Sequence, residues 1–173
     1  MGVHSKKVGV IAIIAVAALS IASLSIEAAE RKEQTYVKDN FTTGYKTSVM
    51  VGDVPNHEVG QELTISEIKY SNPSFKTKGE WVYNQFDYTD GSGAHRGTFI
   101  DTHEDGTQTY GTYEGTQKTV VNSDGSWEAT WEGKYRYVGG TGKYKNIKGT
   151  GTYKGRASSE DPAHEEGREV IEY

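Results

Sequence analysis

The chain has 173 residues, no cysteine and a formal net charge of −5 at neutral pH. The length is that of one domain, and the lack of cysteine excludes a disulfide framework, a thiolate metal site and a cysteine nucleophile. Phosphate binding needs a concentrated basic surface, so the acidic balance argues against a nucleic-acid partner. Aromatic residues make up 11% of the chain, and disordered segments are usually poor in them.

Residues 1–29 have the pattern of a secretory signal. A short positive stretch precedes an apolar run over residues 8–24, and small residues then surround Ala28, where a signal peptidase could cut. The run is slightly shorter than the roughly 20 residues that span a bilayer core, so an uncleaved anchor is the alternative. Both alternatives predict an exported protein, periplasmic or secreted, with one folded domain over residues 30–173 and membrane contact only through the apolar run.

The folded domain begins with polar, turn-rich segments. A short strand is expected near residues 35–37. Residues 42–62 mix Gly, Asp, Pro and His, which indicates a loop crossing. Residues 63–70 predict a strand that ends before Pro73, because proline has no N–H to donate to a sheet.

Three Asp-Gly pairs punctuate the next part of the chain, and this dipeptide is the strongest short-range signal for a hairpin with a type I′ turn. The pairs begin at Asp90, Asp105 and Asp124, and Gly139-Gly140 makes a fourth turn. The strands between these turns are expected at residues 80–89, 95–103, 107–121 and 126–138.

Residues 126–138 carry the clearest period of two. Trp127, Trp131 and Tyr135 fall on one face, and charged or hydroxyl residues alternate with them. Successive side chains of a strand point to opposite faces, so this pattern predicts a half-buried strand with an aromatic inner face and a candidate bulge at Gly133. The strand over residues 80–89 has an aromatic phase that shifts along its length, which indicates either two covered faces or a bulge.

The last strong strand, residues 147–156, carries glycines at every second position, including Gly151 and Gly155. Large side chains opposed by glycines on the neighbouring strand are typical of a small barrel interior. Residues 158–166 are expected to be a loop, and residues 168–173 could form a closing strand. The pattern therefore predicts an all-β domain, a closed antiparallel up-and-down barrel of about eight strands, because closure removes exposed sheet edges.

Two segments, residues 86–97 and 137–149, resemble a group of uncharacterised exported bacterial proteins. The second contains Gly-Gly-Thr-Gly-Lys-Tyr at residues 139–144 and is similar to the Gly-Gly-Thr-Gly-Lys-aromatic segment of the allene oxide cyclase and dirigent families. Those families share an eight-stranded barrel with an apolar cavity, and they cyclise an oxylipin or guide the coupling of phenolic radicals without a cofactor of their own. The resemblance implies a cavity and is compatible with a homo-oligomer. No catalytic residue of either family matches this chain.

Aromatic side chains are the main candidates for an interior ligand site. The candidates are Trp81, Tyr83, Tyr110, Tyr113, Trp127, Trp131, Tyr135 and Tyr137. The alternative is a packed aromatic core, because few aliphatic residues remain to fill the interior.

Charged candidates cluster on the strand over residues 95–103. His95, Asp101 and His103 share one face and could hold a metal or orient a base. The two histidines would lie about 27 Å apart along an extended strand, so one ion cannot bridge them, and Asp101 with His103 is expected to be a solvated pair near a turn. Arg96 could bind a carboxylate, although a cross-strand pair with Asp87 or Asp101 is favoured. No metal and no cofactor are predicted.

Three functions remain open, because the common hydrolase, nucleotide and zinc-protease motifs are absent. The preferred hypothesis is a barrel that binds a small apolar or aromatic molecule in its interior. The second is a cofactor-free cyclase or isomerase with Tyr or His as proton donor, and the third is a filled barrel that acts through its surface as an envelope or interaction protein. An interior pocket with two or more convergent polar groups would favour the enzyme.

Overall fold

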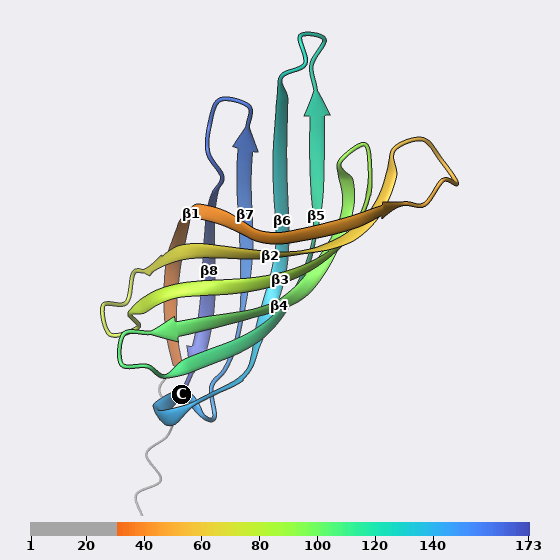
Figure 1. Cartoon of the computed structure of the whole chain (residues 1–173). Coiled ribbons are helices and arrows are strands. Elements are labelled where there is room, and N and C mark those ends of the chain that lie inside the picture. Colours follow the sequence, from red (N-terminus) through yellow and green to blue (C-terminus); the bar gives the residue numbers. More distant parts are fainter. Residues whose placement is uncertain (1–30) are drawn as a thin grey trace, which may run out of the picture.

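The computed structural model describes residues 31–173, which form an eight-stranded antiparallel barrel that closes between its first and last strands (Figure 1). The predicted all-β, up-and-down topology is confirmed. The strands are β1 (Arg31–Met50), β2 (His57–Tyr70), β3 (Thr77–Thr89), β4 (Ser92–His103), β5 (Gln108–Val121), β6 (Trp127–Gly140), β7 (Lys148–Ser158) and β8 (His164–Glu172), with one 3-10 turn, η1 (Gly142–Tyr144). In Figure 1, β1 to β4 cross in front of the upright β5 to β8.

Strand β1 is the largest departure from the sequence prediction. Residues 42–62 are predicted to be a loop, whereas β1 continues to Met50 and β2 already begins at His57. The second half of β1 is exposed along its whole length, so both faces accept polar side chains and no period of two marks the strand. Register shifts between Asp39 and Thr42 and again near Tyr45 bend it away from the barrel axis.

The Asp-Gly turns divide into two types. Asp90 and Gly91 both have positive φ, at 51° and 72°, as a type I′ turn requires. At the other two pairs only the glycine is left-handed, with φ of 81° at Gly106 and 87° at Gly125. Those two hairpins therefore use longer loops that end on a left-handed glycine.

Strands β6 and β7 pack rings against glycines, as the sequence predicts. Trp131 pairs with Gly155, and Tyr135 pairs with Gly151. A Cβ atom added to either glycine would lie 2.2 Å from the opposing ring. The rings therefore occupy space that any larger residue on β7 would fill.

The predicted irregularities of β6 and β3 are resolved in different ways. No register shift occurs at Gly133, so the bulge considered there is wrong. Gly133 instead makes room for Tyr153, whose hydroxyl oxygen would lie 2.4 Å from an added Cβ. Strand β3 runs without a shift past Asn84, so the bulge considered there is wrong. Its rings occupy both faces, but the outer face is not covered as the other alternative expected, because Trp81 is 51% exposed and Tyr83 is 38% exposed.

An aromatic plug seals one end of the barrel. Phe75 of the β2–β3 loop and Tyr144 of η1 are at most 1% exposed, and their ring centroids lie 5.1 Å apart. His103 at the end of β4 packs against both rings, at 4.7 Å and 4.4 Å. The loop and η1 thus cover this end of the interior.

The ring-on-glycine packing predicts a large effect for a small substitution. Gly151→Ala should lower the free energy of unfolding by about 1–3 kcal/mol, because the added methyl group overlaps the Tyr135 ring. Urea unfolding monitored by circular dichroism measures this. Gly44→Ala is the matched control, since its Cβ would meet its nearest neighbour at an ordinary 3.7 Å, and it should change stability by less than about 0.5 kcal/mol. Equal effects of the two substitutions would contradict the packing argument.

Candidate functional site

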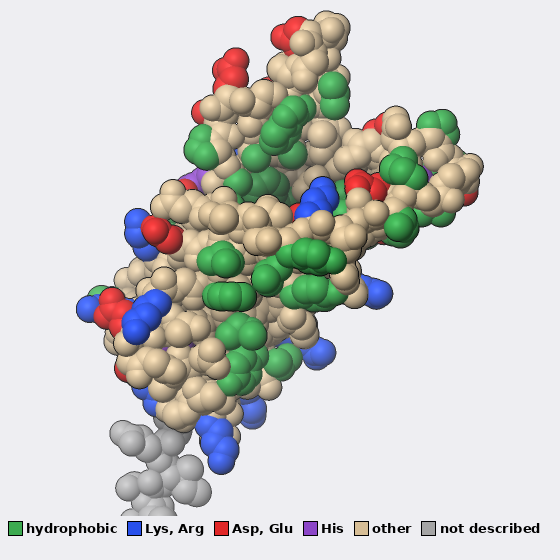
Figure 2. All heavy atoms as spheres, viewed as in Figure 1, with side chains coloured by type: hydrophobic (Ala, Val, Ile, Leu, Met, Phe, Trp, Pro, Cys, Tyr) green, Lys and Arg blue, Asp and Glu red, His purple; other side chains and the backbone are tan. Residues whose placement is uncertain are grey.

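The interior holds a cavity of about 410 Å³ at the end opposite the plug. Its walls are inward-facing side chains of all the strands, and its outermost lining residues are Thr43, Trp127 and Ala163. These residues lie where β1, β6 and the β7–β8 loop project beyond the barrel, and Figure 2 shows apolar side chains gathered in the hollow between these projections. A volume of this size is within the range of small-molecule sites.

Six of the sequence-predicted ligand residues reach this cavity. His95, Trp131 and Tyr135 line it from within, and Trp127 lies at the rim with 39% of its surface exposed. Tyr113 and Tyr137 line it as well. That these residues bind a ligand stays a prediction.

The other four predicted residues lie on the outer surface. Trp81 is 51% exposed and Tyr83 38% exposed, Arg96 is exposed, and Tyr110 is half-buried on the outer face of β5. None of them lines the cavity, so the expectation that they form part of an interior pocket is wrong.

The register of β3 explains the error. Both faces of this strand carry rings, and the sequence offers no reason to prefer one. The inner face carries Glu80 and Asn84, both less than 9% exposed, together with the buried Phe86, so polar and aromatic residues share this face. Arg96 points outward because it follows the inward-facing His95.

Asp101 and His103 form a buried cluster rather than the predicted solvated pair, at 0% and 1% exposure. Because Asp101 faces the interior, it cannot pair with the outward-facing Arg96. Asp87 contacts His57 instead, with 2.8 Å between the carboxylate and Nε2. Within residues 31–173 no group of three or more His, Asp or Glu side chains is placed to hold a metal ion.

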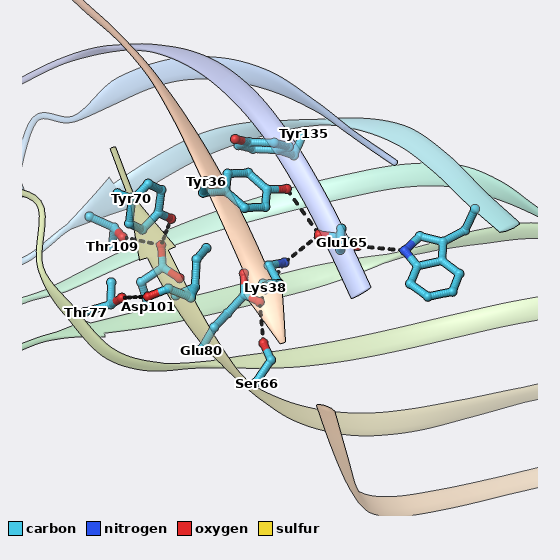
Figure 3. Close-up of polar contacts among 12 residues, drawn as sticks. Tyr36, Lys38, Ser66, Tyr70, Thr77, Glu80, Asp101, Thr109, Tyr135 and Glu165 are labelled. Atoms are coloured by element: carbon cyan, nitrogen blue, oxygen red, sulfur yellow. Dashed lines mark hydrogen bonds and ion pairs between the residues drawn. The ribbon is translucent and has the colours of Figure 1, made fainter. Parts of the chain in front are cut away.

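A buried lysine lies between two buried glutamates on the wall of the cavity (Figure 3). The Lys38 ammonium is 2.7 Å from Glu80 and 2.9 Å from Glu165, and all three side chains are at most 10% exposed. Burial opposes the charge on Lys38, but the attraction of Glu165 and Glu80 outweighs it and raises the lysine pKa above its usual value. Burial also raises the pKa of Glu80.

Neighbouring donors add hydrogen bonds to both glutamates. The Tyr36 hydroxyl donates to Glu165 at 3.2 Å, and the Trp131 indole N–H donates to the other oxygen at 2.8 Å. Ser66 donates to Glu80 at 3.2 Å. A buried charge is tolerated only when it is paired and hydrogen-bonded, and these contacts meet that condition.

Another buried carboxyl group, that of Glu169, lies in the same interior. Glu169 of β8 accepts hydrogen bonds from Gln34 and from the hydroxyls of Tyr135 and Tyr137, the last at 3.0 Å. Burial raises its pKa in spite of these donors. The polar ends of two cavity-lining tyrosines are thus held in place by a carboxyl group of the opposite wall.

Asp101 is the most completely buried acid among the described residues. One of its oxygens accepts from the hydroxyls of Tyr70 at 3.2 Å and Thr109 at 3.0 Å, and the other has no partner within residues 31–173. Burial, and then the neighbouring Glu80, raise the pKa of Asp101 well above its usual value. Asp101 therefore keeps its proton to a higher pH than an exposed aspartate does.

His95 contributes a neutral imidazole to the cavity. Its Nε2 lies 2.7 Å from the Tyr153 hydroxyl and its Nδ1 lies 3.5 Å from the Tyr88 hydroxyl. Burial lowers the pKa of His95 below its usual value, so the ring is uncharged at neutral pH. A neutral histidine beside a phenol can accept or relay a proton.

The sequence analysis missed the acidic and basic residues of the cavity. Lys38 and Glu165 lie in segments without a recognised pattern, and Glu165 falls in a stretch predicted to be a loop. Glu62 ends the segment that is predicted to be a loop, and Glu80 begins a strand that is interpreted from its aromatic residues. Glu165 and Glu169 are four residues apart, so a strand through both would place them on the same face. This spacing is the one weak signal in the sequence for the two acids.

No protein-family model matches this chain, and no curated protein matches it. The resemblance of residues 86–97 and 137–149 to the allene oxide cyclase and dirigent barrels therefore stays a prediction. Within the described part of the chain, no helix is both long and apolar enough to cross a membrane. The predicted signal or anchor falls outside the described residues.

The buried acids predict an unusual pH dependence of stability. An unfolded aspartate titrates near pH 4, and the pKa of Asp101 in the folded protein is higher. The stabilisation of the folded protein by protonated Asp101 is therefore complete below about pH 4 and is lost as the pH rises through the folded pKa. Asparagine does not titrate, so Asp101→Asn should not lose stability in this way as the pH rises. The stability of the variant relative to the parent should therefore increase as the pH rises above about 4 and level off above the folded pKa of Asp101. Urea unfolding at each pH from 4 to 8 measures this.

The control for this experiment is Asp161→Asn in the exposed β7–β8 loop. Its stability difference from the parent should stay nearly constant over the same range. A constant difference for Asp101→Asn as well would show that the aspartate is ionised in the folded protein.

Proposed function

We propose that this protein binds a small molecule with an aromatic or apolar body inside the barrel. The observation that supports the proposal best is the cavity of about 410 Å³, which is lined by rings and opens opposite the aromatic plug. Small-molecule sites are typically concave, mostly apolar and supplied with a few placed polar groups. Lys38, Glu165 and His95 are such groups.

The packing of the wall supports a preformed site. Trp131 and Tyr135 are held from behind by glycines of β7, and their polar ends are held by Glu165 and Glu169. A side chain that is fixed on both sides does not need to reorganise when a ligand enters. Preorganisation of this kind lowers the entropic cost of binding.

The direct test is native mass spectrometry of the full chain after purification from its own host. A bound small molecule should appear as a mass increment that is lost on collisional activation. The protein is proposed to be exported, so the cell envelope and the medium are the fractions to purify from. If the protein carries no ligand and takes up no probe, the proposal fails, and the remaining hypothesis is a filled barrel that acts through its surface.

Filling the cavity should abolish binding. Ala129 lies on the inner face of β6 and lines the cavity, and its neighbour Thr130 is exposed on the outer face. Ala129→Phe should weaken uptake of a neutral fluorescent probe, N-phenyl-1-naphthylamine, by at least about tenfold, because the ring occupies the ligand's space. Thr130→Phe adds the same ring to the outside and should bind the probe as the parent does. Equal binding by the two variants would place the probe elsewhere.

Acid–base catalysis on the bound molecule is a second candidate function, which the convergence of polar groups in the cavity favours. His95 is neutral, lines the cavity and has Tyr153 at hydrogen-bond distance. Its Nδ1 makes only a long contact, to Tyr88 at 3.5 Å. This nitrogen is therefore the more available one for taking a proton from a ligand.

An enolisable ketone of suitable size, such as 2-tetralone, tests this candidate. A general base at His95 would remove a proton from the carbon beside the carbonyl group and return a deuteron in D2O. The exchange rate, followed by NMR, should fall about 100-fold or more in His95→Gln, while affinity for the neutral probe stays within about twofold. A ketone that binds without faster exchange in the parent protein would eliminate this candidate and leave binding intact.

A further inference from the structure

The charged side chains that line the cavity are unbalanced. They comprise Lys38 and three acids, Glu62, Glu80 and Glu165, so the formal sum is +1 − 3 = −2. Protonation of Glu80, which burial favours, would still leave a sum of −1. His95 is uncharged at neutral pH and does not offset the difference.

Lys38 is already committed to two of the acids. Its ammonium contacts both Glu80 and Glu165 and lies 5.3 Å from the centroid of the Tyr36 ring. The cavity wall thus shows how this interior accommodates a cation, which is by carboxylates on one side and an aromatic face on the other. Neither ion pair of Lys38 involves the third acid, Glu62.

Glu62 is the acid without a cation. Its carboxylate accepts one hydrogen bond, from the Asn84 amide at 3.1 Å, and forms no ion pair with any residue in the range 31–173. Lys46 lies opposite it in the β1–β2 register, but the lysine ammonium lies 5.0 Å from the centroid of the Phe86 ring and does not line the cavity.

Two tyrosines share the cavity wall with Glu62. Tyr88 and Tyr113 line the same cavity, and the Tyr113 hydroxyl donates to Asn84 at 2.8 Å. Asn84 is therefore hydrogen-bonded to both Glu62 and Tyr113 and links the two side chains. A carboxylate and aromatic side chains thus share this part of the wall, as they do near Lys38, and no ion pair to Glu62 is formed within residues 31–173.

We propose that the ligand of this cavity is an organic cation, with an ammonium group that binds Glu62 and an apolar or aromatic body that contacts the rings. The inference rests on the proposed function and adds the chemical class of the ligand. A charge-assisted hydrogen bond to a partly buried carboxylate and contact with aromatic faces both favour an ammonium group. An anionic ligand of the same shape would meet the excess of carboxylates and bind less well.

Three probes with one ring system separate charge from shape. They are 1-naphthalenemethylamine, 1-naphthalenemethanol and 1-naphthoate, measured by isothermal titration calorimetry with the full chain at pH 7. The amine should bind at least about tenfold more tightly than the alcohol, and the naphthoate more weakly than both. An amine that binds no better than the alcohol, or a naphthoate that binds best, overturns the cation inference and leaves the proposed function standing. If none of the three binds, the proposed function fails and the inference falls with it.

Substitution of Glu62 tests the contact itself. Glu62→Gln should lower the affinity for the amine to that for the alcohol and leave the alcohol unchanged. Glu132→Gln, on the exposed outer face of β6, is the matched control and should change neither affinity. Glu62→Asp keeps the charge and should retain the preference for the amine, which also covers the case in which the Gln variant does not fold. An unchanged amine preference in folded Glu62→Gln would overturn the assignment.

Discussion

Rings enter the interior of this barrel where a neighbouring strand carries a glycine. Trp131 and Tyr135 of β6 occupy the space above Gly155 and Gly151 of β7, and Tyr153 of β7 reaches back over Gly133. Interiors of proteins are packed as densely as organic crystals, so a side chain of this size needs a matching gap. The distribution of glycines therefore decides which rings point inward and where the interior is full.

The choice of aromatic residues has an electrostatic consequence. Most inward rings of this chain are tyrosines, and a buried hydroxyl must find an acceptor. The acceptors are carboxyl groups, chiefly Glu165 and Glu169 of β8 and Asp101 of β4. Burial penalises the charged form of each such group, and Lys38 supplies the compensating positive charge at only one point. The interior is consequently both aromatic and acidic.

These two properties together define the candidate site. The end that is sealed by Phe75 and Tyr144 is filled with rings in edge-to-face contact, whereas the other end is left with the cavity. Its polar groups are held by hydrogen bonds to neighbouring strands, so they form a rigid wall. A cavity with rigid aromatic walls, a neutral histidine and a surplus of carboxylates selects its ligand by charge as well as by shape.

Much of the fold is readable from local patterns. The period of two over residues 126–138, the glycines of residues 147–156 and the Asp-Gly pairs act over a few residues, so they predict strands, hairpins and the ring-on-glycine pairing without knowledge of distant segments. The cyclic order follows, because a chain of hairpins with an aromatic inner face buries that face by closing.

The tertiary structure alone decided which face of β3 is buried and where β1 ends. Both faces of β3 carry rings, and the face that carries Glu80 and Asn84 can lie inside because Lys38 pairs with Glu80 and the Tyr113 hydroxyl donates to Asn84 there. In the same way, the acids and the lysine of the cavity come from β1, β2, β3 and β8, which meet only when the barrel closes. Sequence by itself determined the alternation within each strand. The partners that make a buried charge tolerable lie on other strands, so only the closed barrel determined the site.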